Sequence, residues 1–217
     1  YFMSSELFIS KLFKNRSYTT ISSNIAKSDG QELYDDTFSF FDNKTVSISH
    51  HFKPSKDLAI SLRSSYAKRY FNSKYYYTRS LYDDSNELIK KLWNQAKIDY
   101  KINNKSNVDF NYSFQSVNDK YIFMPGLVYK NKTKLFNSRV NYTINNNKSQ
   151  LAVGLDFQNR HMVSIDRGTQ SDRYFGGYIN YRKNVNNLSI SPSLRLDYNQ
   201  SYNCLLYTSD AADELRS

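Results

Sequence analysis

The sequence is poor in cysteine, glycine, proline and tryptophan. Its 217 residues contain one Cys, six Gly, three Pro and one Trp. A single Cys excludes an internal disulfide framework and a cysteine-based zinc site. So few glycines argue against a Gly-rich phosphate-binding loop. No run of about 18 apolar residues occurs, which excludes helices that span a membrane.

Aromatic residues, in contrast, are abundant, with 20 Tyr and 14 Phe in the chain. Disordered chains are depleted in aromatic residues, which instead favour β-strands, so we expect a folded, β-rich protein. The net charge of +10 raises the question of a nucleic-acid partner. The basic residues are scattered along the chain and not gathered in a stripe or tail, so we expect no nucleic-acid binding.

Apolar and polar residues alternate with a period of two along most of the chain, which predicts β-strands. In 150–163, for example, Leu151, Val153 and Leu155 alternate with small or polar residues. The alternating runs are about twice as long as a typical strand of a globular protein. Strands are predicted at 3–12, 17–27, 44–52, 57–66, 91–102, 107–117, 134–145, 150–163, 173–183 and 188–199.

The connections between these strands alternate between short and long. Short Asn- and Lys-rich turns are predicted at 14–17, 53–57, 103–106, 145–148 and 184–187, and longer loops at 28–43, 71–88, 119–133 and 164–172. This asymmetry is typical of an up-and-down outer-membrane barrel. We therefore predict an all-β fold: a partial antiparallel up-and-down transmembrane β-barrel of about ten strands, with short periplasmic turns and long extracellular loops.

One segment gives a conflicting signal. Residues 85–93 also have the pattern of a short helix, with Ser85 as its cap and Leu88, Leu92 and Trp93 on one face. We place this segment at the end of the second long loop, as a helical turn that precedes the next strand.

Several sequence segments resemble the barrel of TonB-dependent outer-membrane receptors, most closely the vitamin B12 or ferric-siderophore receptors. These segments are Ser28–Gly30, Lys44–Leu62, Ser138–Phe157 and Leu188–Tyr198, and the resemblance covers residues 5–203. It implies a 22-stranded barrel around an N-terminal plug domain. It also implies the outer membrane of a Gram-negative bacterium, with lipid and lipopolysaccharide around the barrel, a small-molecule ligand, and the TonB complex acting through the plug.

We divide the chain into two parts. Residues 1–203 are interpreted as a partial TonB-dependent receptor barrel domain, without the plug and the energy-coupling box. Residues 204–217 have an alanine-containing, acidic composition unlike the Lys-, Asn- and Tyr-rich body, and they resemble a translated sequencing adapter. We expect this tail to be non-native and exclude it from functional reasoning.

Candidate ligand-binding residues lie in the second and fourth long loops. Tyr75, Tyr76 and Tyr77, together with Arg79, would present stacking surfaces and a cation to a flat ligand such as a ferric chelate. Asp166 and Arg167 would add charges from the fourth loop. The alternative for all of these residues is ordinary loop packing.

Charged residues of both signs recur on the polar side of the alternating runs. Cross-strand ion pairs between them would satisfy these groups in a polar barrel interior. The resemblance adds the docking of a plug domain, and the alternative is that these residues only stabilise the wall. The predicted lumen wall comprises Arg63, Asp109, Arg139, Asp156, Arg160, Arg195 and Asp197.

A metal site is considered in the first loop. Asp29, Asp35, Asp36 and Asp42 supply the carboxylate oxygens that calcium prefers, although the spacing is not that of an EF-hand and a solvated acidic loop is the alternative. The adjacent pair at 50–51, both His, would point to opposite faces of a strand and could not chelate one ion. No catalytic motif is present, so we expect the protein not to be an enzyme.

The sequence therefore predicts a fragment of an outer-membrane receptor or transporter that takes part in TonB-dependent uptake of a scarce ligand: a ferric siderophore, haem or cobalamin. Two alternatives stay open. One is a small porin or OmpA-like barrel, which a plug domain upstream would exclude. The other is a soluble secreted β-sandwich that acts as a binding module, which would be monomeric without detergent.

Overall fold

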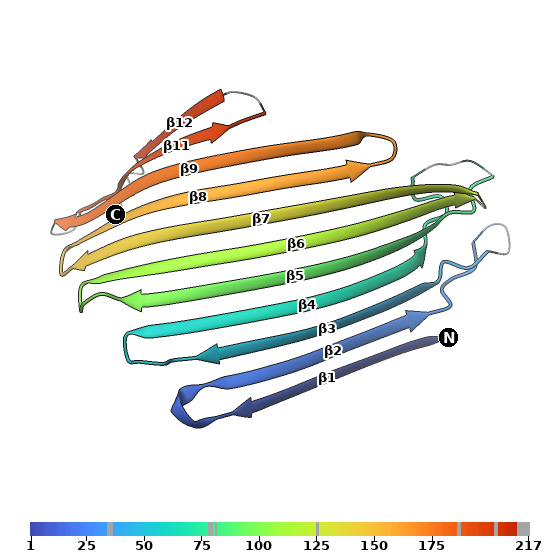
Figure 1. The fold of residues 1–217 in the computed structure, drawn as a ribbon, viewed down its shortest axis with the longest axis horizontal. Coiled ribbons are helices and arrows are strands. Elements are labelled where there is room, and N and C mark those ends of the chain that lie inside the picture. The colour runs from blue at the N-terminus through green and yellow to red at the C-terminus, as the bar shows by residue number, and fades with distance from the viewer. Residues whose placement is uncertain are drawn as a thin grey trace.

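The chain forms one antiparallel sheet whose strands follow one another in chain order (Figure 1). The computed structural model describes residues 1–33, 37–77, 80, 82–124, 126–185, 188–201 and 204–211. A 3-10 turn, η1 (Lys14–Arg16), joins the first two strands. The strands are β1 (Phe2–Leu12), β2 (Tyr18–Ser28), β3 (Phe41–Phe52), β4 (Leu58–Asn72), β5 (Asn86–Lys101), β6 (Ser106–Met124), β7 (Leu127–Asn146), β8 (Ser149–Ser164), β9 (Gly168–Val185), β10 (Leu188–Ile190), β11 (Pro192–Asn199) and β12 (Cys204–Ala211).

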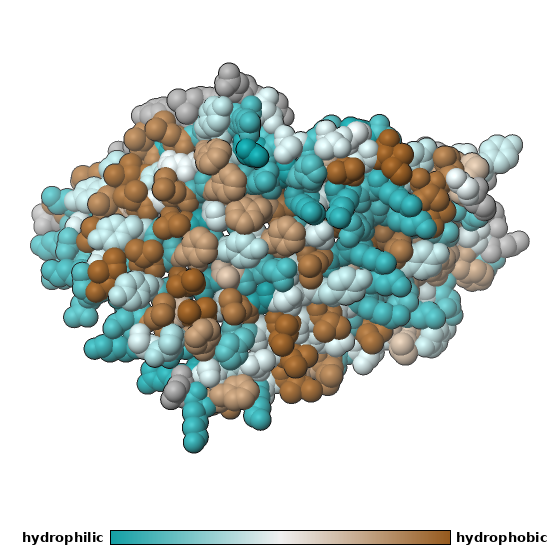
Figure 2. Space-filling model, in the orientation of Figure 1, coloured by the Kyte–Doolittle hydropathy of each residue, from teal (hydrophilic) through white to brown (hydrophobic). Residues whose placement is uncertain are grey.

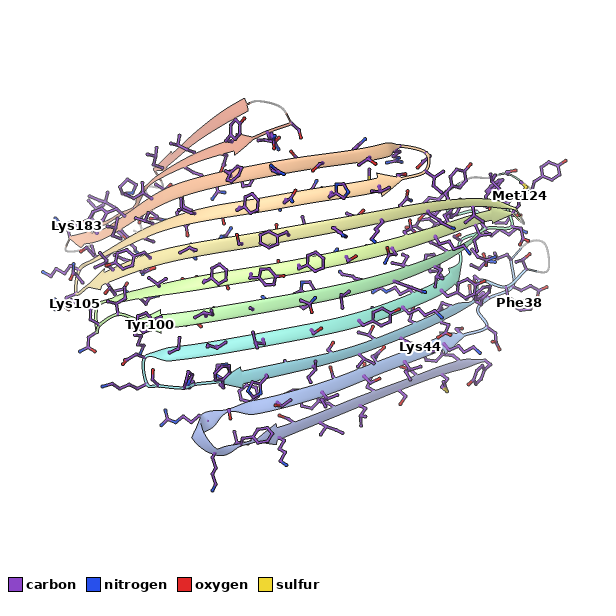
Figure 3. All side chains as sticks on the ribbon, viewed as in Figure 1. Phe38, Lys44, Tyr100, Lys105, Met124 and Lys183 are labelled. Carbon is purple, nitrogen blue, oxygen red and sulfur yellow. The ribbon has the colours of Figure 1, made fainter. Side chains whose placement is uncertain are left out.

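Each strand is hydrogen-bonded to its neighbours in the chain, except that β11 bypasses the three-residue β10 to pair with β9. The up-and-down antiparallel fold is thereby confirmed. The short turns lie at one end of the strands, near Tyr100, Lys105 and Lys183, and the long loops lie at the other end, near Phe38 and Met124 (Figure 3). No helix in the described ranges is long and apolar enough to cross a membrane.

The ladder register sorts the side chains onto two faces, because partners in a ladder share a face. One row defines what we call the polar face: Tyr18, His51, Ser61, Lys97, Asn111, Arg139, Asp156, Gly176 and Asp197. The neighbouring row defines the apolar face: Phe52, Ile60, Ile98, Phe110, Val140, Leu155, Gly177 and Leu196.

The apolar face has no protein layer over it. None of the described apolar side chains is buried, and Leu155 in the middle of β8 is 66% exposed. A β-sandwich would bury this face against a second sheet, so the sandwich alternative is disfavoured. In the view of Figure 2, apolar and aromatic residues gather on the left and centre, with a hydrophilic stretch to their right. A lipid-facing band of a transmembrane barrel accounts for this exposure.

The helical turn predicted within 85–93 is wrong, because β5 already begins at Asn86. This segment has a strand on each side: Leu88 is opposite Tyr70 of β4 and Lys120 of β6. The two ladders satisfy its backbone groups, which overrides the local helical pattern.

Two of the four predicted long loops are also wrong. β6 extends to Met124 and β7 begins at Leu127, and only three residues separate the end of β8 at Ser164 from the start of β9 at Gly168. The polar residues that suggested loops instead pair across tall hairpins. β7 has 20 residues, about twice the length that a barrel strand needs to span a bilayer, so the β6–β7 hairpin projects well beyond the apolar band.

Candidate functional site

Aromatic side chains gather on the polar face at the end of the strands where the long loops lie. We call this group the rim cluster: Tyr76, Tyr77, Tyr121, Phe123 and Tyr129. Tyr77 of the second loop meets Tyr121 of β6 edge-on, with ring centroids 5.2 Å apart. Tyr121 is opposite Tyr129 of β7, at 6.2 Å, and Tyr76 packs against Tyr77 at 4.8 Å. The second loop and the β6–β7 hairpin thus build one aromatic surface.

The hydroxyl of Tyr77 anchors the second loop to the sheet. It donates a hydrogen bond of 2.8 Å to Oε2 of Glu87, a buried residue of β5. Removal of the hydroxyl from water raises the pKa of Tyr77 above its usual range, and the bond to Glu87 raises it further. The phenol therefore stays protonated, as a donor, throughout the physiological range of pH.

Asp83 fixes the rest of this loop from within. Its carboxylate accepts hydrogen bonds from the backbone N–H of Tyr75, at 2.8 Å, and of Ser85, at 3.1 Å, and Asp83 is buried. Tyr75 has a φ of +63°, which is uncommon for a residue with a side chain. These bonds hold the loop in one conformation, with Tyr76 and Tyr77 exposed by 74% and 59%.

We expect Tyr77→Phe to loosen the second loop without removing its aromatic surface. The substitution deletes the donor to Glu87 and leaves a buried carboxylate with one partner fewer, which costs about 1–3 kcal/mol locally. Limited proteolysis of the complete protein should cut within residues 73–85 several-fold faster in the variant. Tyr76→Phe is the matched control, because none of the described hydrogen bonds involves the Tyr76 hydroxyl, and it should be cut at the wild-type rate.

Only two of the three tyrosines predicted to bind a ligand belong to the rim cluster. Tyr76 and Tyr77 belong to it, whereas the ring of Tyr75 lies under Lys74, with Nζ 5.4 Å from the ring centroid. Arg79 lies outside the described residues. Sequence reasoning missed Tyr121, Phe123 and Tyr129, because 119–133 was interpreted as a loop, although Tyr121 and Phe123 continue the alternation of β6.

Asp166 and Arg167 form the tip of the β8–β9 hairpin. Asp166 lies within hydrogen-bonding distance of the Ser164 hydroxyl, which lowers the pKa of Asp166 below its usual range. Arg167 Nε is 3.7 Å from Oδ2 of Asp166. The two predicted charges thus face each other, and none of the described ring contacts connects them to the rim cluster.

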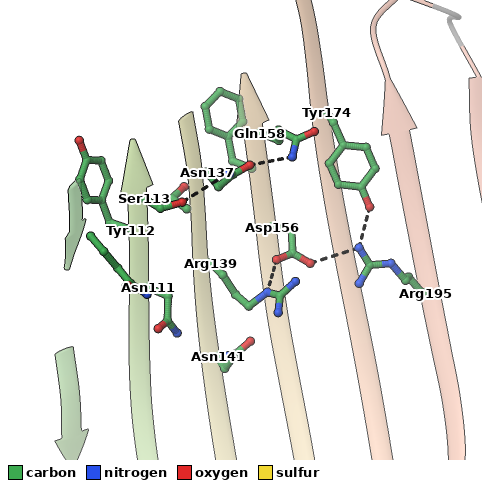
Figure 4. A pocket seen from close by; sticks show the side chains of 13 residues that line it. Asn111, Tyr112, Ser113, Asn137, Arg139, Asn141, Asp156, Gln158, Tyr174 and Arg195 are labelled. Atoms are coloured by element: carbon green, nitrogen blue, oxygen red, sulfur yellow. Dashed lines mark hydrogen bonds and ion pairs between the residues drawn. The ribbon is translucent and has the colours of Figure 1, made fainter. Parts of the chain in front are cut away.

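Farther from the loops, an ionic network crosses four strands of the polar face (Figure 4). Asp156 of β8 pairs with Nε of Arg139 on one side and, at 3.2 Å, with Nη2 of Arg195 on the other. Arg195 also pairs with Asp197 at 2.9 Å and donates to the hydroxyl of Tyr174 at 2.6 Å. The Asp156 side chain is only 10% exposed, so its charge is held between the two guanidinium groups.

A second chain of hydrogen bonds adjoins this network. Tyr178 of β9 donates to Oδ1 of Asn141 at 2.6 Å, and Asn141 Nδ2 donates to Asp109 at 2.8 Å. The guanidinium of Arg195 lies 5.9 Å from the centre of the Tyr178 ring. A polar basin of about 660 Å³ over β5 to β11 is lined by Arg139, Asp156, Tyr174 and Arg195 of the network and by Asn141 of the second chain.

Glycines make room for the tyrosines of this network. A Cβ on Gly154 would lie 2.4 Å from the ring of Tyr178, and one on Gly176 would lie 2.9 Å from the hydroxyl of Tyr174. Both glycines lie on the polar face, next to Asp156 in the ladders of β8 and β9. The close approach of the rings explains glycine at these positions.

The seven residues predicted for the lumen wall all lie on the polar face, but they form separate groups. Arg139, Asp156, Arg195 and Asp197 belong to the ionic network, and Asp109 to the adjoining chain of hydrogen bonds. Arg63 lies over the ring of Trp93, 5.3 Å from its centre. Arg160 is opposite Asp172 in the β8–β9 ladder.

The described acidic residues of the first loop are not brought together. Asp29 lies 3.7 Å from the N-terminal amine of Tyr1, and Asp42 pairs with Lys44 at 3.0 Å. Asp35 and Asp36 lie outside the described residues, so calcium binding stays a prediction. Among the described residues, no group of three or more His, Cys, Asp or Glu is placed to hold a metal.

The adjacent histidines His50 and His51 point to opposite faces, as predicted. His50 Nδ1 lies 2.8 Å from the Thr19 hydroxyl on the apolar face. His51 Nδ1 lies 2.8 Å from the Ser61 hydroxyl on the polar face.

No family model matches this sequence, and no curated protein matches it. Solved structures do resemble it. The siderophore receptor PirA from Pseudomonas aeruginosa superposes with a TM-score of 0.78 at 11% identity, over 100% of this chain and 37% of that one. The ferric-catecholate import receptor Fiu from E. coli K12 gives 0.74 at 9%, over 92% and 42%. The ferric citrate transporter FecA in its unliganded form gives 0.71 at 9%, over 96% and 37%.

The chain thus spans well under half the length of the receptors that it resembles. At these identities the likeness concerns the fold, and at that level the resemblance to receptor barrels and the outer-membrane β-barrel fold are both confirmed. The chain has the fold of a contiguous part of an outer-membrane receptor barrel.

Proposed function

We propose that the chain is part of an outer-membrane receptor that takes part in TonB-dependent uptake of a scarce small-molecule ligand. The observation that carries the proposal is the rim cluster, an exposed aromatic surface anchored at the loop end of a receptor-type barrel wall. Flat, partly apolar ligands stack on such surfaces. The ligand classes that fit this surface are ferric siderophores, haem and cobalamin.

Each part of the wall has a role in this proposal. The rim cluster makes the first contact with the ligand, outside the membrane. The polar face below it, with the ionic network and the basin of about 660 Å³, would contact the protein's own plug domain. The TonB complex would then act on the plug, and in this proposal the chain itself is not an enzyme.

The proposal is tested by uptake with the complete gene. A Gram-negative strain that lacks its own receptors would receive this gene and grow on ferric siderophores, haem or cobalamin as the sole source of the nutrient. We expect growth on one ligand class, only when the TonB complex is intact. In the double variant Tyr76→Ala and Tyr77→Ala, half-maximal growth should need on the order of tenfold more ligand, since each stacked ring contributes about 0.5–1.5 kcal/mol beyond burial.

Growth that does not depend on the TonB complex would contradict the proposal and support the passive channel, the porin or OmpA-like alternative. The matched control is Tyr82→Ala, a tyrosine that is 84% exposed in the same loop and makes none of the described ring contacts. We retain the division of the chain at residue 203 as part of this proposal, with 204–217 as a non-native tail.

A further inference from the structure

The short turns at one end of the strands carry a row of exposed basic side chains. We call these residues the basic turn row: Lys14, Arg16, Lys53, Lys56, Lys105 and Lys148. None of the described ion pairs includes a residue of this row. Asp57 is the one carboxylate among the described residues of these turns. The turn end of the wall therefore presents a positive charge that the described residues leave uncompensated.

Backbone hydrogen bonds tie successive turns together. The N–H of Asn145 donates to the carbonyl of Lys105 at 2.6 Å, which joins the end of β7 to the β5–β6 turn. The N–H of Asn184 donates to the carbonyl of Lys148 at 2.8 Å, which joins the end of β9 to the β7–β8 turn. Figure 3 shows Lys105 at this end of the strands, together with Tyr100. The basic residues are thus held at defined places along one continuous row.

The outward, apolar face stays apolar as far as these turns. Tyr100 and Tyr142 lie on it, both opposite Val108, and tyrosines gather where a membrane meets water. Ile102, the first residue after β5, is 50% exposed, and Val185 at the end of β9 is 43% exposed. The turns follow directly, so the basic turn row lies at the depth of the lipid headgroups. Long basic side chains extend into that layer while their stems stay on apolar surface.

We propose that the basic turn row binds the phosphate groups of anionic phospholipids in the periplasmic leaflet of the outer membrane. The Nζ groups of Lys105 and Lys148 donate hydrogen bonds to the phosphate oxygens, while Tyr100 and Tyr142 pack against the glycerol and the first acyl carbons. The row runs from the β1–β2 turn to the β7–β8 turn, which matches a layer of headgroups better than the compact surface of an acidic protein. The proposal rests on the fold and its orientation, with short turns in the periplasm, and does not depend on the transported ligand.

The test uses the complete receptor in lipid nanodiscs that contain a small fraction of photoreactive phosphatidylglycerol. Crosslinks are mapped by mass spectrometry of peptides, and phosphatidylethanolamine with the same reactive group near the glycerol is the uncharged comparison. We expect crosslinks within 101–106 and 145–149 to be on the order of tenfold more frequent with phosphatidylglycerol, because each lysine near anionic lipid raises the affinity by roughly a factor of five. Equal crosslinking by the two lipids would overturn the proposal.

Variants of the turn row separate charge from shape. Lys105→Gln with Lys148→Gln should lower phosphatidylglycerol crosslinking at these turns to the level of phosphatidylethanolamine, and Arg at both positions should retain it. The matched control is Lys91→Gln with Lys97→Gln, which removes the same charge from exposed positions on the polar face of β5, away from lipid. It should crosslink as the wild type does. The same yield from the turn variant and the control would contradict the proposal.

A second measurement needs no variant. Crosslinking of the wild type to phosphatidylglycerol should fall as the ionic strength rises from about 0.05 to about 0.5 M, since salt shortens the range of attraction between charges. Crosslinking to phosphatidylethanolamine should stay constant, and an equal response of the two lipids to salt would speak against the proposal. Efficient displacement of the lipid by soluble poly-glutamate would assign the row to an acidic protein and overturn the lipid as its occupant. None of these measurements depends on uptake, so they stand apart from the test of the proposed function.

Discussion

Asp156→Asn should lower the free energy of unfolding of the complete barrel by about 2–3 kcal/mol. The substitution keeps the size and shape of the side chain but removes the charge between Arg139 and Arg195. Breaking a buried ion pair costs about 3–5 kcal/mol, and the partial exposure of the two arginines, 53% and 33%, reduces that figure. Denaturant-driven unfolding in detergent would measure the loss.

The chain offers a matched control in Asp99→Asn. Asp99 pairs with Lys97 on the same polar face at 3.1 Å, but both side chains are nearly half exposed, at 46% and 47%. An exposed pair contributes about 0–1 kcal/mol. The two variants should therefore differ by at least about 1 kcal/mol. Equal losses would show that the ionic network does not hold the wall together.

Gly154→Ala is the second substitution with a large expected effect. Its Cβ would lie 2.4 Å from the Tyr178 ring and 2.6 Å from Oδ1 of Asn141. The ring has to move, which breaks its hydrogen bond to Asn141 and its contact with Arg195. We expect a loss of about 1–3 kcal/mol in the free energy of unfolding, the usual cost of overpacking.

Gly177→Ala is the control for this substitution. Gly177 lies in β9, on the apolar face, where a Cβ would meet Leu155 at an ordinary contact distance of 3.5 Å. It should change stability by less than about 0.5 kcal/mol. In a double-mutant cycle, Tyr178→Ala should remove most of the cost of Gly154→Ala, since the ring that clashes is gone. Full additivity of the two substitutions would contradict the steric explanation.

The alternation of residue types was sufficient to predict the central part of most strands and the face on which the seven residues of the predicted lumen wall lie. Arg139 and Asp156 are 17 positions apart in sequence, yet both were placed on the wall from the period of two and the short turn between them. The pairing register was not predictable in the same way. It decides that Asp156 lies between two arginines and that Arg63 lies over Trp93 instead.

The features that were missed depend on the same register. The tall β6–β7 hairpin was interpreted as a loop, because its polar residues resemble loop residues until their cross-strand partners are known. The lysines also appeared scattered along the chain, although Lys68 and Lys90 of two different strands are directly opposite each other. A row across a sheet is visible only after the strands are aligned.

The chain-order pairing of the strands has a consequence for how the wall is assembled. Nearly every ladder joins two strands that are consecutive in sequence, so each new strand finds its partner by closing the one connection between them, and most of these connections are short. Short closures cost little conformational entropy and favour fast formation of contacts, in contrast to the distant pairings that make most all-β folds slow. The wall can therefore grow by one hairpin at a time. Deletion of a strand from its middle would leave two separate sheets, because the strands on either side would lose the partner that joins them.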